Sequence, residues 1–64
     1  MTERREQLRR LKNTVMGAGN RLNLLGRSGE LGPQAETELR AMAAELSDVA
    51  RRLERILTGL REEV

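Results

Sequence analysis

Apolar residues recur along the chain in two stretches, with spacings that alternate between three and four positions. They fall at Leu8, Leu11, Val15, Ala18, Leu22 and Leu25 in the first stretch, and at Leu39, Met42, Leu46, Val49, Leu53, Ile56 and Leu60 in the second. This spacing places a hydrophobic stripe along one side of an α-helix. The pattern predicts two amphipathic helices, over about residues 2–28 and 33–62.

The segment between the two stretches carries the residues that end one helix and begin another. Gly29 suits the left-handed conformation that follows a helix, and Pro33 suits the first position of the next helix. Thr2 is a candidate N-cap of the first helix, with Glu3 and Glu6 close to the positive end of its dipole. A connection this short makes the two helices antiparallel neighbours.

The two stripes match when the chain is folded about residue 32. Positions whose numbers add up to 64 then face each other, so that Leu25 meets Leu39 and Leu11 meets Leu53. The same register places Arg21 near Glu45. The sequence therefore predicts one all-α domain over residues 1–64, an antiparallel two-helix hairpin.

The core of a single hairpin is thin, because the chain has no aromatic residue to enlarge it and no cysteine to cross-link it. A second row in the later stretch, seven residues apart, also widens its apolar side beyond what one neighbour needs. That row is Ala43, Ala50, Leu57 and Val64. We expect the hairpin to dimerise into a four-helix bundle.

Gly17 and Gly19 lie inside the first predicted helix, where each glycine costs about 1 kcal/mol relative to alanine. One explanation is the close approach of a neighbouring helix, with Gly19 and Gly26 facing Ala43 and Ala50. The other is an exposed, weakened point of the helix at which a partner docks. The sequence leaves both explanations open.

The composition argues against catalysis, since histidine and cysteine, the commonest catalytic and metal-binding residues, are both absent. We predict that the chain is not an enzyme and binds no metal or cofactor. No apolar run approaches the length of a membrane span, and no signal-peptide pattern precedes the first stretch. These features favour a cytoplasmic protein that does not engage the membrane.

The net charge of +2 is unevenly distributed, with +5 over residues 1–28 and −3 over residues 29–64. The split is explained by two helices that attract each other, or by a basic face that meets an anionic partner. The candidate anion or nucleic-acid contacts are Arg9, Arg10, Lys12 and Arg27. The outward side of the first helix also mixes apolar and amide residues, which makes it a candidate docking face for another protein. Its residues are Asn13, Met16, Gly17, Asn20, Asn23 and Leu24.

The stretch from Leu11 to Ala18, followed by Leu24 and Leu25, resembles the first helix of the dimerisation and histidine-phosphotransfer hairpin of sensor histidine kinases. Residues 53–61 are similar to the second helix of that family. The resemblance covers most of the chain and implies a dimeric four-helix bundle. It also implies that a receiver domain docks on the first helix, near Asn13 and Met16.

The resemblance fails at the residues that carry the family's chemistry. Arg9 occupies the position of the phosphoaccepting histidine, and Arg10 that of its acidic neighbour. Phosphotransfer is therefore not implied, whereas the dimer and the docking surface are. The hypothesis is a non-catalytic, homodimeric interaction or regulatory module that docks a two-component signalling protein.

A second resemblance, of size and architecture, is to the plasmid RNA-binding hairpin protein Rop. It implies an alternative function, in which the basic residues of the first helix bind RNA or DNA. The absence of aromatic residues disfavours stacking on the bases of single strands. A third alternative is a structural assembly subunit with no separate ligand.

Overall fold

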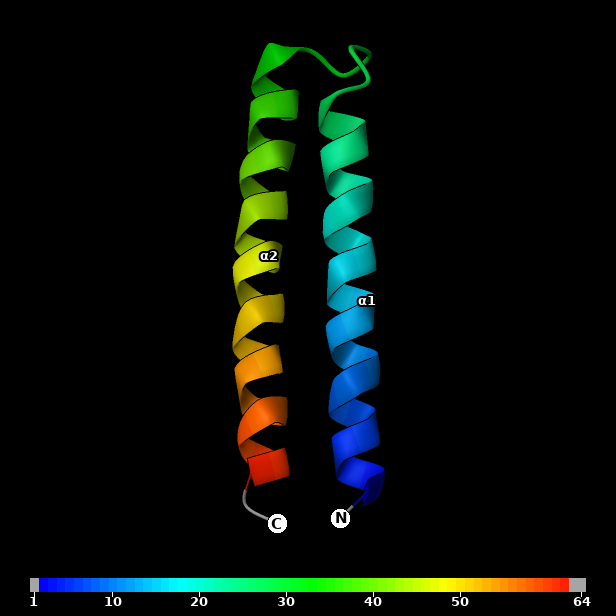
Figure 1. Ribbon diagram of the computed structural model, residues 1–64. Coiled ribbons are helices and arrows are strands. Elements are labelled where there is room, and N and C mark those ends of the chain that lie inside the picture. Colours follow the sequence, from blue (N-terminus) through cyan, green and yellow to red (C-terminus); the bar gives the residue numbers. More distant parts are fainter. Residues whose placement is uncertain (1, 63–64) are drawn as a thin grey trace.

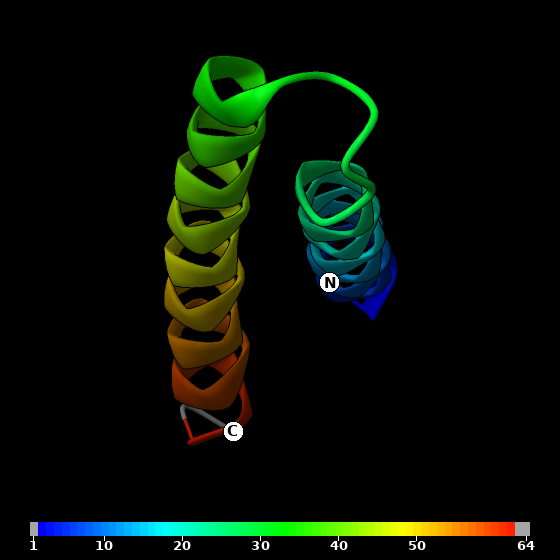
Figure 2. The same cartoon turned by 90° about the horizontal axis from the view of Figure 1, so that it is seen from above.

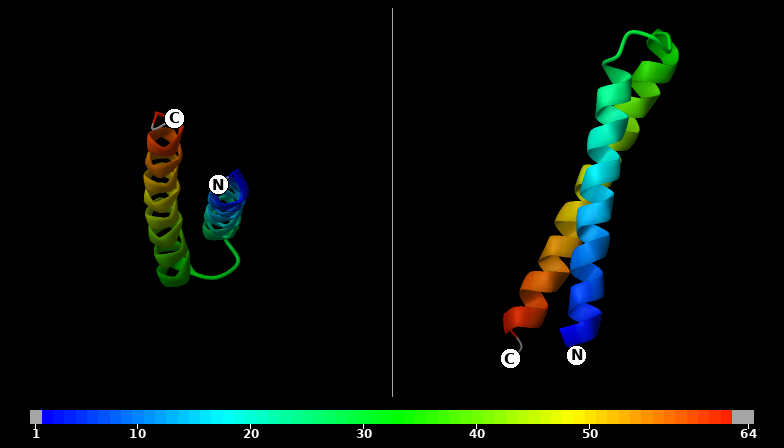
Figure 3. Two further views of the ribbon diagram at one scale, coloured as in Figure 1. Left: turned by 90° about the horizontal axis from the view of Figure 1, so that it is seen from below. Right: turned by 90° about the vertical axis from the view of Figure 1, so that its right-hand side faces the viewer.

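Two long helices make up the whole fold. The computed structural model describes the backbone of residues 2–62 and the side chains of residues 3–60. Helix α1 (Thr2–Gly26) and helix α2 (Pro33–Glu62) lie side by side and antiparallel, with both ends of the chain opposite the loop (Figure 1). Viewed along and across their length, the helices cross at a shallow angle (Figures 2 and 3). The prediction of an all-α hairpin is confirmed, with α1 ending two residues earlier than expected.

Local hydrogen bonds end α1. The backbone N–H groups of Arg27 and Ser28 donate to the carbonyls of Leu24 and Leu25, at 3.1 and 3.2 Å, which tightens the last turn. The Ser28 hydroxyl also donates to the Leu25 carbonyl at 2.9 Å. Gly29 follows with φ of 77°, the left-handed conformation expected from the sequence.

The start of α2 has a cap that the sequence analysis missed. Pro33 is the first helical residue, as predicted, and Gly32 before it has φ of 94°. The Glu36 N–H donates to the Gly32 carbonyl at 3.0 Å, and the Glu36 carboxylate accepts the Leu31 N–H at 3.4 Å. The predicted cap of α1 by the Thr2 hydroxyl lies outside the described side chains.

Each helix turns one row of residues toward the other. Leu57 and Ala50, each 7% exposed, are the buried apolar side chains among the described residues. Gly19 and Gly26 of α1, which have no side chain, are buried as well. The half-buried apolar residues of this interface are Leu8, Val15, Leu22, Leu39, Ala43, Leu46 and Leu53. The glycine and alanine positions bring the two backbones close together, because they carry little or no side chain.

The row containing Ala43, Ala50 and Leu57 lies toward α1, in line with the close approach that the sequence offered as one explanation of Gly19. Ala50 and Leu57 are buried against α1, while Val64 lies outside the described residues. The two helices are rotated so that half of each predicted stripe faces inward and the other half faces solvent. The physical reason is that Gly19 and Gly26 offer α2 a closer approach than the leucines of the stripe.

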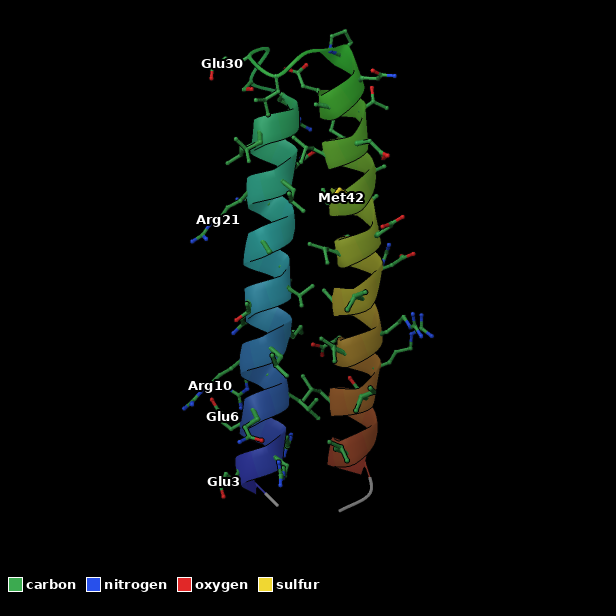
Figure 4. All side chains as sticks on the ribbon, turned by 180° about the vertical axis from the view of Figure 1, so that it is seen from behind. Glu3, Glu6, Arg10, Arg21, Glu30 and Met42 are labelled. Atoms are coloured by element: carbon green, nitrogen blue, oxygen red, sulfur yellow. The ribbon has the colours of Figure 1, made fainter. Side chains whose placement is uncertain are left out.

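The predicted register is close to the one observed, although its expected ion pair does not form. An alanine Cβ at Gly19 would lie 3.5 Å from Leu46 Cβ, so Gly19 faces Leu46. The position numbers of these facing residues add up to 65, and the predicted sum is 64. Arg21 pairs with no described residue, because the helix rotation directs it away from α2 (Figure 4). Lys12 Nζ instead pairs with Glu54 Oε1 across the interface at 2.7 Å.

Candidate interaction surfaces

One side of the hairpin presents a continuous apolar surface. Helical geometry places every seventh residue at nearly the same angle, so the outward half of each stripe runs along the helix as a line. We call this surface the apolar face. Its members are Leu11, Ala18 and Leu25 of α1 and Met42, Val49, Ile56 and Leu60 of α2. All but Ala18 are large hydrophobic residues classed as exposed.

The hairpin exposes more surface than a compact protein of its mass. Its accessible area is 5312 Å², whereas the size scaling of compact monomers gives about 4,100 Å² for 7.2 kDa. The excess of about 1,200 Å² exceeds the roughly 800 Å² that each partner contributes to a standard interface. The radius of gyration of 14.8 Å likewise exceeds the about 11 Å of a compact domain of this length. A single hairpin is therefore less compact than a typical globular domain of its length.

A shallow groove lies between the helices on the side opposite the apolar face. The small residues that line it are Gly19, Ala43, Ala44 and Ser47. Met16, Asn20 and Asn23 of α1 and Arg40 of α2 line it as well. A second hollow shares Met16 and Ser47 with this groove and is also lined by Lys12, Arg51 and Glu54.

The predicted docking face of α1 is divided between two places. Met16, Asn20 and Asn23 line the groove. Asn13, Gly17 and Leu24 are exposed and, by helical geometry, lie on the side of α1 that points away from α2. The six residues therefore form no single concave surface, although Leu24 and Met16 are among the exposed large hydrophobic residues.

Most of the candidate anion contacts already have acidic partners. The ion pairs join Arg9 to Glu6 at 3.4 Å, Arg10 to Glu6 at 3.7 Å, and Lys12 to Glu54 at 2.7 Å. Among the four candidates, only Arg27 has no ion pair to a described residue. The positions of Arg10 and Glu6, close together on the outer side of α1, are visible in Figure 4.

The two glycines inside α1 differ in their surroundings. A Cβ at Gly17 would meet nothing within 4 Å, whereas one at Gly19 would lie 3.6 Å from the Ala43 carbonyl oxygen. Gly19 therefore lies against α2, where an added Cβ would make ordinary van der Waals contact, whereas Gly17 faces open space. At Gly26, a Cβ would lie 2.7 Å from Arg40 Cγ and 3.0 Å from the Glu36 carbonyl oxygen, so Gly26 meets the first turns of α2.

These surroundings predict opposite effects for two alanine substitutions. Gly17→Ala is expected to stabilise the protein by about 1 kcal/mol, because alanine restricts the unfolded chain and fits the open space. Gly26→Ala is expected to destabilise it, because the methyl group would press on the α2 backbone at Glu36. Urea unfolding of both variants at one protein concentration measures the difference, and equal effects would contradict the close approach at Gly26.

The described residues hold no cluster suited to metal binding. Within residues 3–60, no three carboxylates gather in the geometry that holds a metal ion. No helix among the described residues is long and apolar enough to cross a membrane. The surfaces that the structure offers are therefore the apolar face, the groove and the charged outer sides of the helices.

The comparisons with known proteins add no relative from which a function could be transferred. The chain matches no protein-family model, no curated protein and no solved structure.

Proposed function

We propose that the chain is a non-catalytic module that dimerises through the apolar face into a four-helix bundle. The observation that carries the proposal is the continuous exposed line of apolar residues on both helices, Leu11 and Leu25 on α1 and Met42, Val49 and Ile56 on α2. Contiguous apolar patches of this extent mark interaction sites in soluble proteins. A second copy offers the same stripe, with the helical spacing needed to pack against it.

Burial of this face supplies the stability that one hairpin lacks. Among the described residues, the buried apolar side chains are only Ala50 and Leu57, each 7% exposed. Burying a leucine, isoleucine, valine or methionine contributes about 1.5–3 kcal/mol when it is removed completely from water. Covering even part of the exposed large residues of two chains therefore outweighs the contribution of either internal core.

The nucleic-acid alternative has less support. It needs cationic groups that are available to phosphates, and three of the four candidates are engaged in ion pairs. Exposed ion pairs contribute only about 0–1 kcal/mol, so they compete weakly with a phosphate. Nothing in that alternative, however, accounts for the apolar face.

Sedimentation equilibrium tests the dimer directly. We expect a mass of twice 7.2 kDa at micromolar concentrations, with helical content that falls as dilution dissociates the dimer. A helical monomer that persists at high micromolar concentration would contradict the proposal. A trimer or larger species would keep the self-association and exclude the four-helix bundle.

A further inference from the structure

The charges of the hairpin are separated along its length. We divide it at mid-height into an open half, residues 3–13 and 49–60, and a loop half, residues 14–48. The open half carries eight basic and three acidic side chains, a net charge of +5. The loop half carries three basic and five acidic side chains, a net charge of −2. The hairpin is 49 Å long, so the centres of its two halves lie farther apart than the Debye length of about 8 Å at physiological ionic strength.

Two symmetric arrangements bring the apolar faces of two hairpins together. In the parallel arrangement the loops lie at the same end, and α1 of each hairpin lies beside α2 of the other. In the antiparallel arrangement the loops lie at opposite ends, and each helix lies beside its own copy. Both arrangements bury the same stripes and make all neighbouring helices antiparallel, so apolar burial and helix dipoles do not separate them.

The charge distribution does separate them. The parallel arrangement places one +5 open half against the other, and one −2 loop half against the other. The antiparallel arrangement places each +5 half against a −2 half. At the scale of single helices, it sets residues 33–48 of α2, with a net charge of −3, beside the partner's residues 49–60, with a net charge of +2.

The stripe and its flank on α2 fit the same arrangement. Met42 and Ile56 lie at equal distances along the sequence from Val49. When two copies of α2 lie antiparallel and meet at Val49, Met42 of one copy therefore lies opposite Ile56 of the other. Glu45 and Arg52 lie on the outer flank of this stripe, and the same reversal places Glu45 within one residue of the partner's Arg52. The two-fold axis makes this ion pair twice.

From these observations we propose that the occupant of the apolar face is a second copy in the antiparallel arrangement, with the two loops at opposite ends of the bundle. The inference rests on the proposed dimer and adds its topology. The arrangement gathers both α1 helices on one side of the bundle and both α2 helices on the other. The first side therefore carries most of the positive charge of the dimer.

A spin-label distance measurement tests the topology. The chain contains no cysteine, so Glu30→Cys, labelled with a neutral nitroxide, gives one probe per chain at the tip of the loop (Figure 4). The substitution leaves the loop half at −1 and the open half at +5, so the two halves remain opposite in sign. In the antiparallel dimer the two labels lie near opposite ends of the 49 Å hairpin length. In the parallel dimer they lie about 20 Å apart, which is two helix spacings.

The three outcomes are distinct. A narrow distribution near the hairpin length supports the antiparallel dimer. A distribution near 20 Å overturns the topology and leaves the proposed dimer intact. If no dipolar coupling is detected and sedimentation of the labelled protein gives the mass of one chain at the same concentration, both are overturned, because the chain is then monomeric.

Charge reversal provides an independent measurement with unlabelled protein. Arg52→Glu is expected to raise the dimer dissociation constant about two- to thirtyfold, because two exposed pairs are replaced by repulsion. The double variant Glu45→Arg with Arg52→Glu is expected to restore it. In the parallel arrangement Arg52 faces the partner's Thr14, and Glu45 faces the partner's Arg21. Arg52→Glu would then have little effect, and the double variant would be weakened, which would overturn the inference.

Discussion

Replacing Ile56 by glutamate is expected to dissociate the proposed dimer. The Ile56 side chain is 49% exposed in the hairpin, so a carboxylate there costs a single chain little. In the dimer the same carboxylate would enter an apolar interface twice, and each buried, unpaired charge costs several kcal/mol. We expect the dissociation constant to rise at least about a hundredfold, since each 1.4 kcal/mol is a factor of ten. Sedimentation velocity across a concentration series measures the change.

Leu24→Glu is the matched control for this prediction. Leu24 is 58% exposed and lies on the side of α1 that points away from α2, outside the apolar face. The substitution introduces the same charge on a comparably exposed residue, and we expect the dimer to persist. If Leu24→Glu and Ile56→Glu dissociate the protein equally, the interface does not lie on the apolar face.

Dissociation of the proposed dimer should also lower the thermal stability of the Ile56→Glu variant. The single hairpin has few buried apolar groups, so with the proposed dimer its stability would depend on association and on protein concentration. Circular dichroism of the variant is therefore expected to show a lower melting temperature than the parent at equal concentration. Raising the protein concentration should raise the melting temperature of the variant less than that of the parent.

The helical hairpin was predictable because several independent signals in the sequence agree. The three-and-four spacing defines the helices, Pro33 defines the start of α2, and Gly29 defines the turn. The number of residues on each side of the loop sets the register. Lys12 therefore pairs with Glu54, whose position numbers add up to 66, close to the predicted sum of 64. These features depend on local geometry and chain length, which the sequence states directly.

The rotation of the helices about their own axes was not predictable in the same way. Each stripe is wide enough to face two neighbours, and periodicity alone does not say which half turns toward α1 and which toward solvent. Packing at Gly19 and Gly26 decides the matter, because the α2 backbone approaches Gly19 at Ala43 and Gly26 at Glu36. This rotation buries Ala50 and Leu57 and leaves Val49 and Ile56 exposed. Gly19 and Gly26 carried this signal in the sequence, whereas Gly17 has the same cost to the helix and no neighbour.

The candidate docking face divides for the same reason. Its six residues lie off the apolar stripe of the first helix, and the stripe alone does not say where α2 lies. The observed rotation places Met16 and Asn20 in the lining of the groove and leaves Gly17 in open space. A groove between two helices is a property of their packing, so sequence periodicity could not have outlined it.

Replacing Leu57 by alanine is expected to have the largest effect on folding of any truncation in the chain. Leu57 is 7% exposed and lies in the row of α2 that faces α1. Removing a buried leucine side chain costs about 2–5 kcal/mol, from lost burial and from the cavity that remains. Domains of this length have a total stability of about 3–10 kcal/mol. Urea unfolding at a fixed protein concentration should show a much lower midpoint with an unchanged slope.

The comparison with Leu24→Ala makes this prediction specific to the inward row. Leu24 has the same side chain, but its exposure means that truncation should change stability by no more than about 0.5 kcal/mol. Leu60→Ala should fall between the two, because Leu60 is 36% exposed in the hairpin and would be covered only in the proposed dimer. Its effect should therefore grow with protein concentration, whereas the effect of Leu57→Ala should not. An order in which Leu24→Ala costs as much as Leu57→Ala would mean that the helices pack through a different row.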